Sequence, residues 1–113
     1  MLGKKYRFPH KNLHKLVAQS NLRIYGKYGS VRILKSQKAD TGIKFAIIIN
    51  KKLANAVKRN KYKRMLRAIL YERYKDSTQP LFIMYIVKSL ASSYIDLKVD
   101  VIQNTEKAIK LVD

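Results

Sequence analysis

The sequence predicts a single α+β domain, a two-layer sandwich with a four-stranded sheet and the element order α-β-β-β-α-β-α. Two short apolar runs, residues 44–49 and 81–87, are rich in isoleucine and other strand-forming side chains. Between them, residues 51–75 contain no glycine or proline and consist mainly of residues that favour helices. A chain of 113 residues has the length of one domain with one modest core, so we assign residues 1–113 to a single domain.

The first third of the chain contributes an arm, a helix and two strands. Residues 1–8 are predicted to form a flexible basic arm, and the apolar spacing after Pro9 predicts a short helix over about residues 10–19. Residues 21–35 alternate apolar and polar side chains around a glycine-flanked turn at 26–29. This pattern predicts two short strands or one bent strand.

Later elements are indicated by apolar runs and a helix cap. Residues 47–49 are all isoleucine, which predicts a strand buried on both faces, and residues 81–87 predict a second such strand. Ser93 and Asp96 have the spacing of a capping box. The helix that follows carries an apolar packing stripe formed by Leu97, Val101, Ala108, Ile109 and Val112.

The charge balance is strongly positive, because 25 Lys and Arg residues face 7 Asp and Glu residues and give a formal net charge of +18. Self-repulsion at this level opposes a compact unbound chain, so it indicates an anionic partner. The lack of cysteine excludes disulfide and thiolate chemistry and is typical of a reducing compartment. No apolar run has the length of a membrane helix or of a signal-peptide core. We therefore expect a cytoplasmic protein with no membrane partner and no small-molecule substrate.

The helix predicted at 51–75 has two different faces. It holds ten of the Lys and Arg residues and one acid, Glu72. At 100° per residue, one side gathers Tyr62, Met65, Leu66, Ile69 and Leu70. The roughly opposite side carries Asn60, Lys63, Arg64 and Arg67. Cations also crowd the start of the helix, where they oppose its dipole: Lys51, Lys52, Lys58, Arg59 and Lys61. Solvated basic faces usually include acids four residues away, so nucleic-acid binding is the better interpretation.

Residues 51–67, KKLANAVKRNKYKRMLR, resemble the signature of the bacterial ribonuclease P protein subunit. That signature reads approximately S-K-K-x-G-x-A-V-x-R-N-R-x-K-R-x-x-R-E. The matching positions are Lys51, Lys52, Ala56, Val57, Arg59, Asn60, Lys63, Arg64 and Arg67. The sequence departs from the signature at Asn50, Ala54, Lys61 and Ala68. Lys61 keeps the positive charge of the arginine it replaces but lacks the planar fork.

The resemblance implies a fold, partners and a division of labour. It implies a left-handed β-α-β crossover in a sandwich similar to ribosomal protein domains, and we follow it although most crossovers are right-handed. It also implies that a catalytic RNA subunit performs the cleavage, that precursor tRNA is the second partner, and that magnesium is bound mainly by RNA. Carried over to matching positions, RNA contacts are expected from Lys51, Lys52, Arg59, Asn60, Lys63, Arg64 and Arg67. Charge alone adds Lys58 and Lys61.

A second candidate site is a cleft for the 5′ leader of precursor tRNA. Tyr25, Tyr28 and Arg32 could line such a cleft, because unpaired bases stack on aromatic side chains and are steadied by arginine. Half-burial of the two tyrosines at a sheet edge is an equally good interpretation. The resemblance also implies aromatic residues on the first helix, but Leu13 and Val17 stand near those positions here.

No catalytic constellation is present in the sequence. The seven carboxylates are scattered, and no glycine-rich phosphate loop or run of metal ligands is found. His10 and His14 would share a helix face, but neither cysteine nor a nearby carboxylate accompanies them, so we expect surface histidines. We therefore expect neither a catalytic residue nor a metal site in the protein itself.

Three alternatives to ribonuclease P stay open. The main one is a non-catalytic RNA-binding protein of the ribosomal type, which composition does not distinguish and which the Arg59-Asn60 motif makes less favoured. A DNA-binding module would place the basic helix in a major groove, but no helix-turn-helix or heptad zipper is evident. A helix lying on an anionic membrane ranks lower, because the predicted strands can cover its apolar face.

Overall fold

The computed structural model describes residues 15, 17, 22–35 and 42–112, and all structural statements refer to these residues. Its elements are β1 (Arg23–Tyr25), β2 (Gly29–Lys35), β3 (Ile43–Ile49), α2 (Ala56–Tyr74), β4 (Leu81–Val87) and α3 (Tyr94–Val112). Lys15 and Val17 are helical, in agreement with the helix predicted at 10–19. The rest of that helix, the arm at 1–8 and the side chains of His10, Leu13 and His14 lie outside the described residues.

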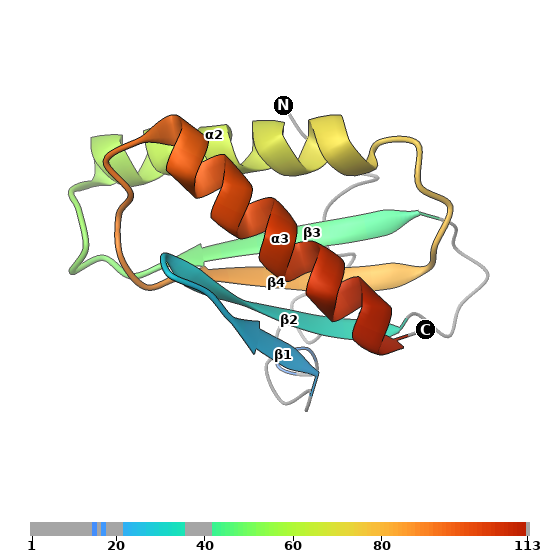
Figure 1. The fold of residues 1–113 in the computed structure, drawn as a ribbon. Coiled ribbons are helices and arrows are strands. Elements are labelled where there is room, and N and C mark those ends of the chain that lie inside the picture. Colours follow the sequence, from blue (N-terminus) through green and yellow to red (C-terminus); the bar gives the residue numbers. More distant parts are fainter. Residues whose placement is uncertain (1–14, 16, 18–21, 36–41, 113) are drawn as a thin grey trace.

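The four strands form one mixed sheet in the order β1-β2-β4-β3. β1 pairs with β2 and β2 with β4 in antiparallel fashion, whereas β3 and β4 are parallel neighbours. A parallel pair needs a long connection, and α2 supplies it. Both helices lie on one face of the sheet, with α3 across β1 and β2 and α2 along β3 (Figure 1). The predicted α+β sandwich is therefore confirmed.

The β3–α2–β4 crossover is left-handed, as the resemblance implies and contrary to the general rule. In Figure 1 both strands run from right to left, α2 returns on the viewer's side of the sheet, and β4 lies below β3. α2 belongs to the viewer's side because it shares one core with α3, which crosses in front of the strands.

The main core lies between the sheet and the two helices. Odd-numbered strand residues such as Ile33, Phe45 and Ile83 face this side, where they meet Leu66 of α2 and Val101 of α3. Alternation along each strand places the even-numbered residues on the other face. There Val17 is fully buried against Phe82 and Met84, so the central strand β4 is buried on both faces as predicted.

The prediction of a doubly buried strand at residues 47–49 is wrong. Ile47 and Ile49 are buried under α2, but Ile48 points to the other face and is 39% exposed. β3 forms the edge of the sheet beyond β4, and the described residues do not cover it there. A continuous apolar run therefore indicated the strand correctly, but not the burial of its second face.

Candidate nucleic-acid interface

The basic helix begins later than the charge run that leads into it. Asn50 follows β3 directly and accepts a hydrogen bond through its side chain from the Lys52 N–H at 2.8 Å, while its carbonyl accepts one from the Leu53 N–H. This turn presents the exposed side chains of Lys51 and Lys52 ahead of the helix. Asn50 stands where the family signature has serine, and its amide oxygen performs a turn-forming role typical of short polar side chains.

Asn55 is the N-cap of α2. Its side-chain oxygen accepts a hydrogen bond from the Lys58 N–H at 2.9 Å, and its carbonyl accepts the first helical bond, from Arg59. The N–H groups of Ala56 and Val57 have no acceptor inside the helix, and both residues are exposed. The first turn contains no acidic residue. The start of α2 thus combines exposed N–H donors, the positive end of the helix dipole and several cations.

The two predicted faces of α2 are found in the structure. Tyr62, Leu66, Ile69 and Leu70 are buried against the sheet and α3, and Met65 is half-buried beside them. On the other side, Asn60 and Arg64 are exposed, whereas Lys63 and Arg67 lie on the flank and are partly covered. The helical period therefore predicted correctly which residues hold the helix in place.

Most cations near the start of α2 form no ion pair with the residues that the structure describes. Within the described part of the chain, no ion pair is formed by Lys51, Lys52, Lys58, Lys61, Lys63 or Arg64. The Nε atom of Arg59 is buried and has no hydrogen-bond partner among the described residues. A cluster of cations without internal partners costs stability through repulsion and suits an external polyanion.

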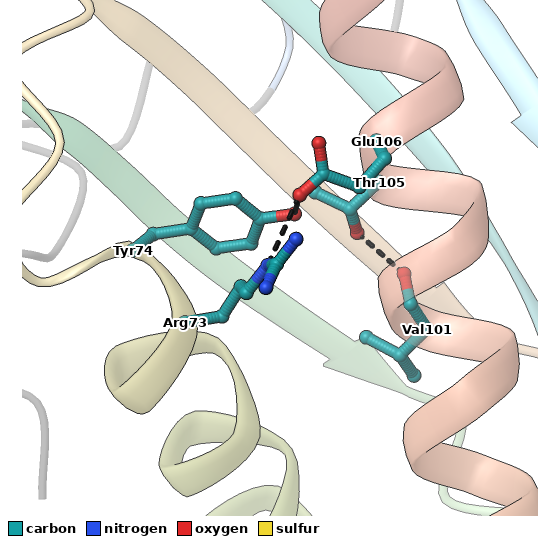
Figure 2. Close-up of polar contacts among 5 residues, drawn as sticks. All are labelled: Arg73, Tyr74, Val101, Thr105 and Glu106. Atoms are coloured by element: carbon teal, nitrogen blue, oxygen red, sulfur yellow. Dashed lines mark hydrogen bonds and ion pairs between the residues drawn. The ribbon is translucent and has the colours of Figure 1, made fainter.

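At the C-terminal end of α2, by contrast, an arginine does form an ion pair within the protein. The Nε–H of Arg73 donates to Oε1 of Glu106 at 3.2 Å, and the Tyr74 hydroxyl donates to the same oxygen at 3.0 Å. Figure 2 shows the two side chains converging on α3, where the Thr105 hydroxyl bonds the Val101 carbonyl. Burial, aided by the bond to Glu106, raises the pKa of Tyr74. The arginine at this end of the helix thus joins two helices of the fold.

The sheet face opposite the two helices carries a second group of basic and aromatic side chains. Tyr25 is 60% exposed, and the register of β1 with β2 places it on the same face as Arg32. The Lys88 ammonium lies 4.5 Å from the centre of the Tyr25 ring, and the Arg23 guanidinium carbon lies 5.9 Å from it. An exposed ring flanked by cations is suited to stacking on an unpaired base.

The structure does not bring Tyr28 to the same place as Tyr25 and Arg32. Tyr28 lies in the β1–β2 turn and packs toward the helix-facing core, with the Lys27 ammonium over its ring. Its N–H and that of Lys27 each donate to the Asp100 carboxylate of α3 at 3.1 Å. Gly26 permits this approach, because a Cβ there would lie 2.9 Å from Oδ2 of Asp100.

Sequence reasoning missed Arg23 and Lys88 as neighbours of Tyr25. Arg23 had a usable signal, since residues two apart on a strand share a face. Lys88 had none, because it follows β4, far along the chain, and is held at the hairpin by the bonds of the Lys88 and Ser89 N–H groups to the Tyr28 carbonyl. Only the strand order brings these distant segments together.

Among the described residues, no three His, Cys, Asp or Glu side chains gather as a metal site would require. Both histidines lie outside this part of the chain. No helix in the described ranges is long and apolar enough to cross a membrane.

Comparison with known proteins identifies the family. The family model for ribonuclease P matches residues 2–110. This chain belongs to the ribonuclease P protein family. A mutant ribonuclease P protein from Staphylococcus aureus, described as defective in mRNA degradation, is 21% identical, with a TM-score of 0.82 over 93% of this chain and 89% of that one. A second structure of the S. aureus ribonuclease P protein is 20% identical, with a TM-score of 0.80 over 91% of this chain and 94% of that one.

A more distant solved structure has the same fold. The ribonuclease P protein from Thermotoga maritima, in complex with 1-(4-fluorophenyl)-2-thiourea, is 17% identical, with a TM-score of 0.75 over 86% of this chain and 94% of that one. No curated protein matches the sequence. Family membership makes the chain a protein component of ribonuclease P and decides against the ribosomal-type alternative.

Proposed function

We propose that this protein supports the 5′ maturation of tRNA by binding the catalytic RNA of ribonuclease P and the leader of precursor tRNA. The observation that carries the proposal is the set of cations around the start of α2 that form no ion pair with the described residues. Because this set coincides with the family signature at 51–67, its partner is inferred to be the RNA subunit.

Each predicted contact has a role that fits its chemistry. Arg59, Arg64 and Arg67 can bind phosphate through two N–H groups at once, whereas the lysines act as compact charges. Asn60 is exposed and can both donate and accept hydrogen bonds at a base or sugar edge. Together these groups neutralise RNA phosphates and release the counterions that those phosphates hold.

The proposed leader site is the sheet face that carries Tyr25 and Arg32. The exposed Tyr25 ring supplies the stacking surface, and Arg23 and Lys88 supply charge beside it. Val17 is packed against Phe82 and Met84, so on the first helix it contributes to the core rather than to stacking. Tyr28 lies on the α3 side and takes no part in this version of the site.

The protein is proposed to have no catalytic residue of its own. The described residues offer no cluster that fits a magnesium ion, so we assign magnesium to the RNA phosphates and derive no step through it. The protein's contribution is electrostatic, because cations placed between two RNA molecules reduce the repulsion between them.

The test is cleavage of a precursor tRNA at physiological magnesium by a bacterial ribonuclease P RNA, with and without the protein. We expect the protein to stimulate cleavage at the mature 5′ end and to be inert alone. The double variant Arg59→Ala/Asn60→Ala should lose the stimulation while keeping its melting temperature. Tight RNA binding without stimulation by the native protein would overturn the proposal.

A further inference from the structure

A groove runs between the first half of α2 and the loop that joins β4 to α3. Figure 1 shows this loop rising beside the start of α2. The groove has a volume of about 560 Å³, within the range of roughly 300–1,000 Å³ that is usual for small-ligand sites. Its lining combines two lysines with mainly apolar side chains, namely Lys58, Lys61, Tyr62, Met65, Leu90 and Ala91.

A hydrogen bond joins the two walls of the groove. The Tyr62 hydroxyl accepts a hydrogen bond from the Ala91 N–H at 3.0 Å, which fixes the loop against the helix. Burial raises the pKa of Tyr62, so this hydroxyl stays neutral at physiological pH. Leu90 is 37% exposed, although leucine gains from burial, and Met65 is half-buried. The apolar side chains of Leu90 and Met65 therefore remain partly exposed to solvent in the groove.

The chemistry of the lining selects one kind of occupant. No acid lines the groove, and neither Lys58 nor Lys61 has an ion partner among the described residues. An occupant must therefore combine negative charge with a flat, largely apolar body, as a nucleotide does. RNA-binding proteins commonly take unpaired bases out of the stack and hold them against apolar and aromatic side chains.

The groove is also continuous with the proposed RNA-binding face. At 3.6 residues per turn, Lys61 lies between Arg64 and Met65 around the helix surface. An RNA strand that contacts Asn60 and Arg64 therefore reaches the groove by crossing Lys61. We propose that this groove receives an unpaired nucleobase of the bound RNA, with Lys58 and Lys61 holding the phosphates on either side. This inference rests on the proposed function, because it deepens the same RNA contact.

The first test probes the groove with adenosine 5′-monophosphate and, as a matched control without a base, ribose 5-phosphate. Amide signals of the full-length protein are followed by NMR during each titration. We expect the Leu90, Ala91 and Ser92 amides to shift with the nucleotide and to shift much less with the sugar phosphate. Equal shifts with both compounds would show a site for phosphate alone, and no shift with either would show no site. Each of these results overturns the proposal.

The second test compares Leu90→Ser with Leu111→Ser in binding to a bacterial ribonuclease P RNA. Leu111 is an exposed leucine at the far end of α3 and serves as the control. Leu90→Ser should weaken RNA binding by about fivefold, which corresponds to the loss of about 1 kcal/mol of contact with the base. Its salt dependence should stay native, because no phosphate contact is removed, whereas Lys58→Gln should reduce the slope by about 0.7–0.9.

The outcomes separate this inference from the proposed function. If Leu90→Ser binds RNA like Leu111→Ser while Arg59→Ala/Asn60→Ala binds poorly, the base site is absent and the proposed RNA-binding face stands. If neither the double variant nor Leu90→Ser weakens binding, both proposals fail. A melting curve of each variant shows that a loss of binding is not a loss of fold.

Discussion

Two arginines of α2 illustrate how single residues divide between fold and function. Arg73 donates to Glu106 and so joins α2 to α3. Arg64 is exposed and forms no ion pair with any described residue. The residue type and the helix are the same, and only the presence of an internal partner differs. For this pair, the internal partner marks Arg73 as a structural cation, and the lack of an ion pair with the described residues makes Arg64 the candidate for RNA binding.

Removing the hydroxyl group should change the free energy of unfolding differently at two buried tyrosines, Tyr74 and Tyr85. The Tyr85 hydroxyl is buried without a hydrogen-bond partner among the described residues, whereas that of Tyr74 donates to Glu106. Tyr85→Phe should leave the free energy of unfolding unchanged or higher. Tyr74→Phe should lower it by about 1 kcal/mol, the usual value of one hydrogen bond. Urea denaturation of both variants measures this. A clear loss of stability in Tyr85→Phe would mean that its hydroxyl has a partner in solution.

The same tyrosines predict how stability changes at alkaline pH. Burial raises the pKa of Tyr85 and of Tyr74 above the value of about 10 found in unfolded chains. Their contribution to stability is therefore complete below pH 10 and is lost as pH rises through the higher folded pKa values. Lysine titration adds its own pH dependence, so the native protein is best compared with Tyr85→Phe. The native protein should lose stability relative to the variant above pH 10, and a constant difference would contradict this.

At the scale of elements, α2 begins with two asparagines that have different tasks. Asn55 caps the helix by accepting a hydrogen bond from the Lys58 N–H, while the Asn60 side chain is exposed on the helix surface. The β1–β2 turn is likewise an anchored element, because Asp100 accepts hydrogen bonds from Lys27 and Tyr28. These anchors fix the start of α2 and the strand that carries Tyr25.

Asn55→Ala and Asn60→Ala form a matched pair for testing this division. Loss of the cap should lower the free energy of unfolding by about 1 kcal/mol in Asn55→Ala, with RNA affinity little changed once the protein is folded. Asn60→Ala should keep native stability and bind RNA more weakly. Thermal melting and RNA titration of each variant provide the measurements. Equal melting temperatures for the two variants would argue against the N-cap role.

Some elements of the structure could be predicted from the sequence, and others could not. The 3.6-residue period of α2 predicted its buried face, because one repeating pattern determines which side meets the sheet. Ile48 was misjudged, since its exposure depends on the position of β3 at the sheet edge. Tyr28 was grouped with Tyr25 because bases can stack on either ring, but the turn geometry directs Tyr28 toward α3. The groove could not be foreseen, because Leu90 and Lys61 are brought together by tertiary structure.

At the scale of the whole molecule, the burial of the core beneath the two helices must outweigh the repulsion that comes with a net charge of +18. Repulsion among these charges opposes folding, and the same charges attract RNA. Salt therefore acts on the two properties in opposite directions: it stabilises the fold by screening the repulsion, and it weakens RNA binding because its cations compete with the protein for the RNA phosphates. The left-handed crossover places α2 on the same face of the sheet as α3, where α2 lies along β3 while α3 packs on β1 and β2 (Figure 1).

The measurement that tests the account most directly is RNA affinity against salt concentration for Arg64→Ala and Arg73→Ala. A bacterial ribonuclease P RNA serves as the ligand, and melting temperature is recorded for both variants. Arg64→Ala should bind more weakly, with a slope of log affinity against log salt shallower by about 0.7–0.9, and should melt like the native protein. Arg73→Ala should bind RNA normally and melt slightly earlier. Native RNA binding by Arg64→Ala, or its unfolding, would contradict the assignment of the cations at the start of α2 to RNA.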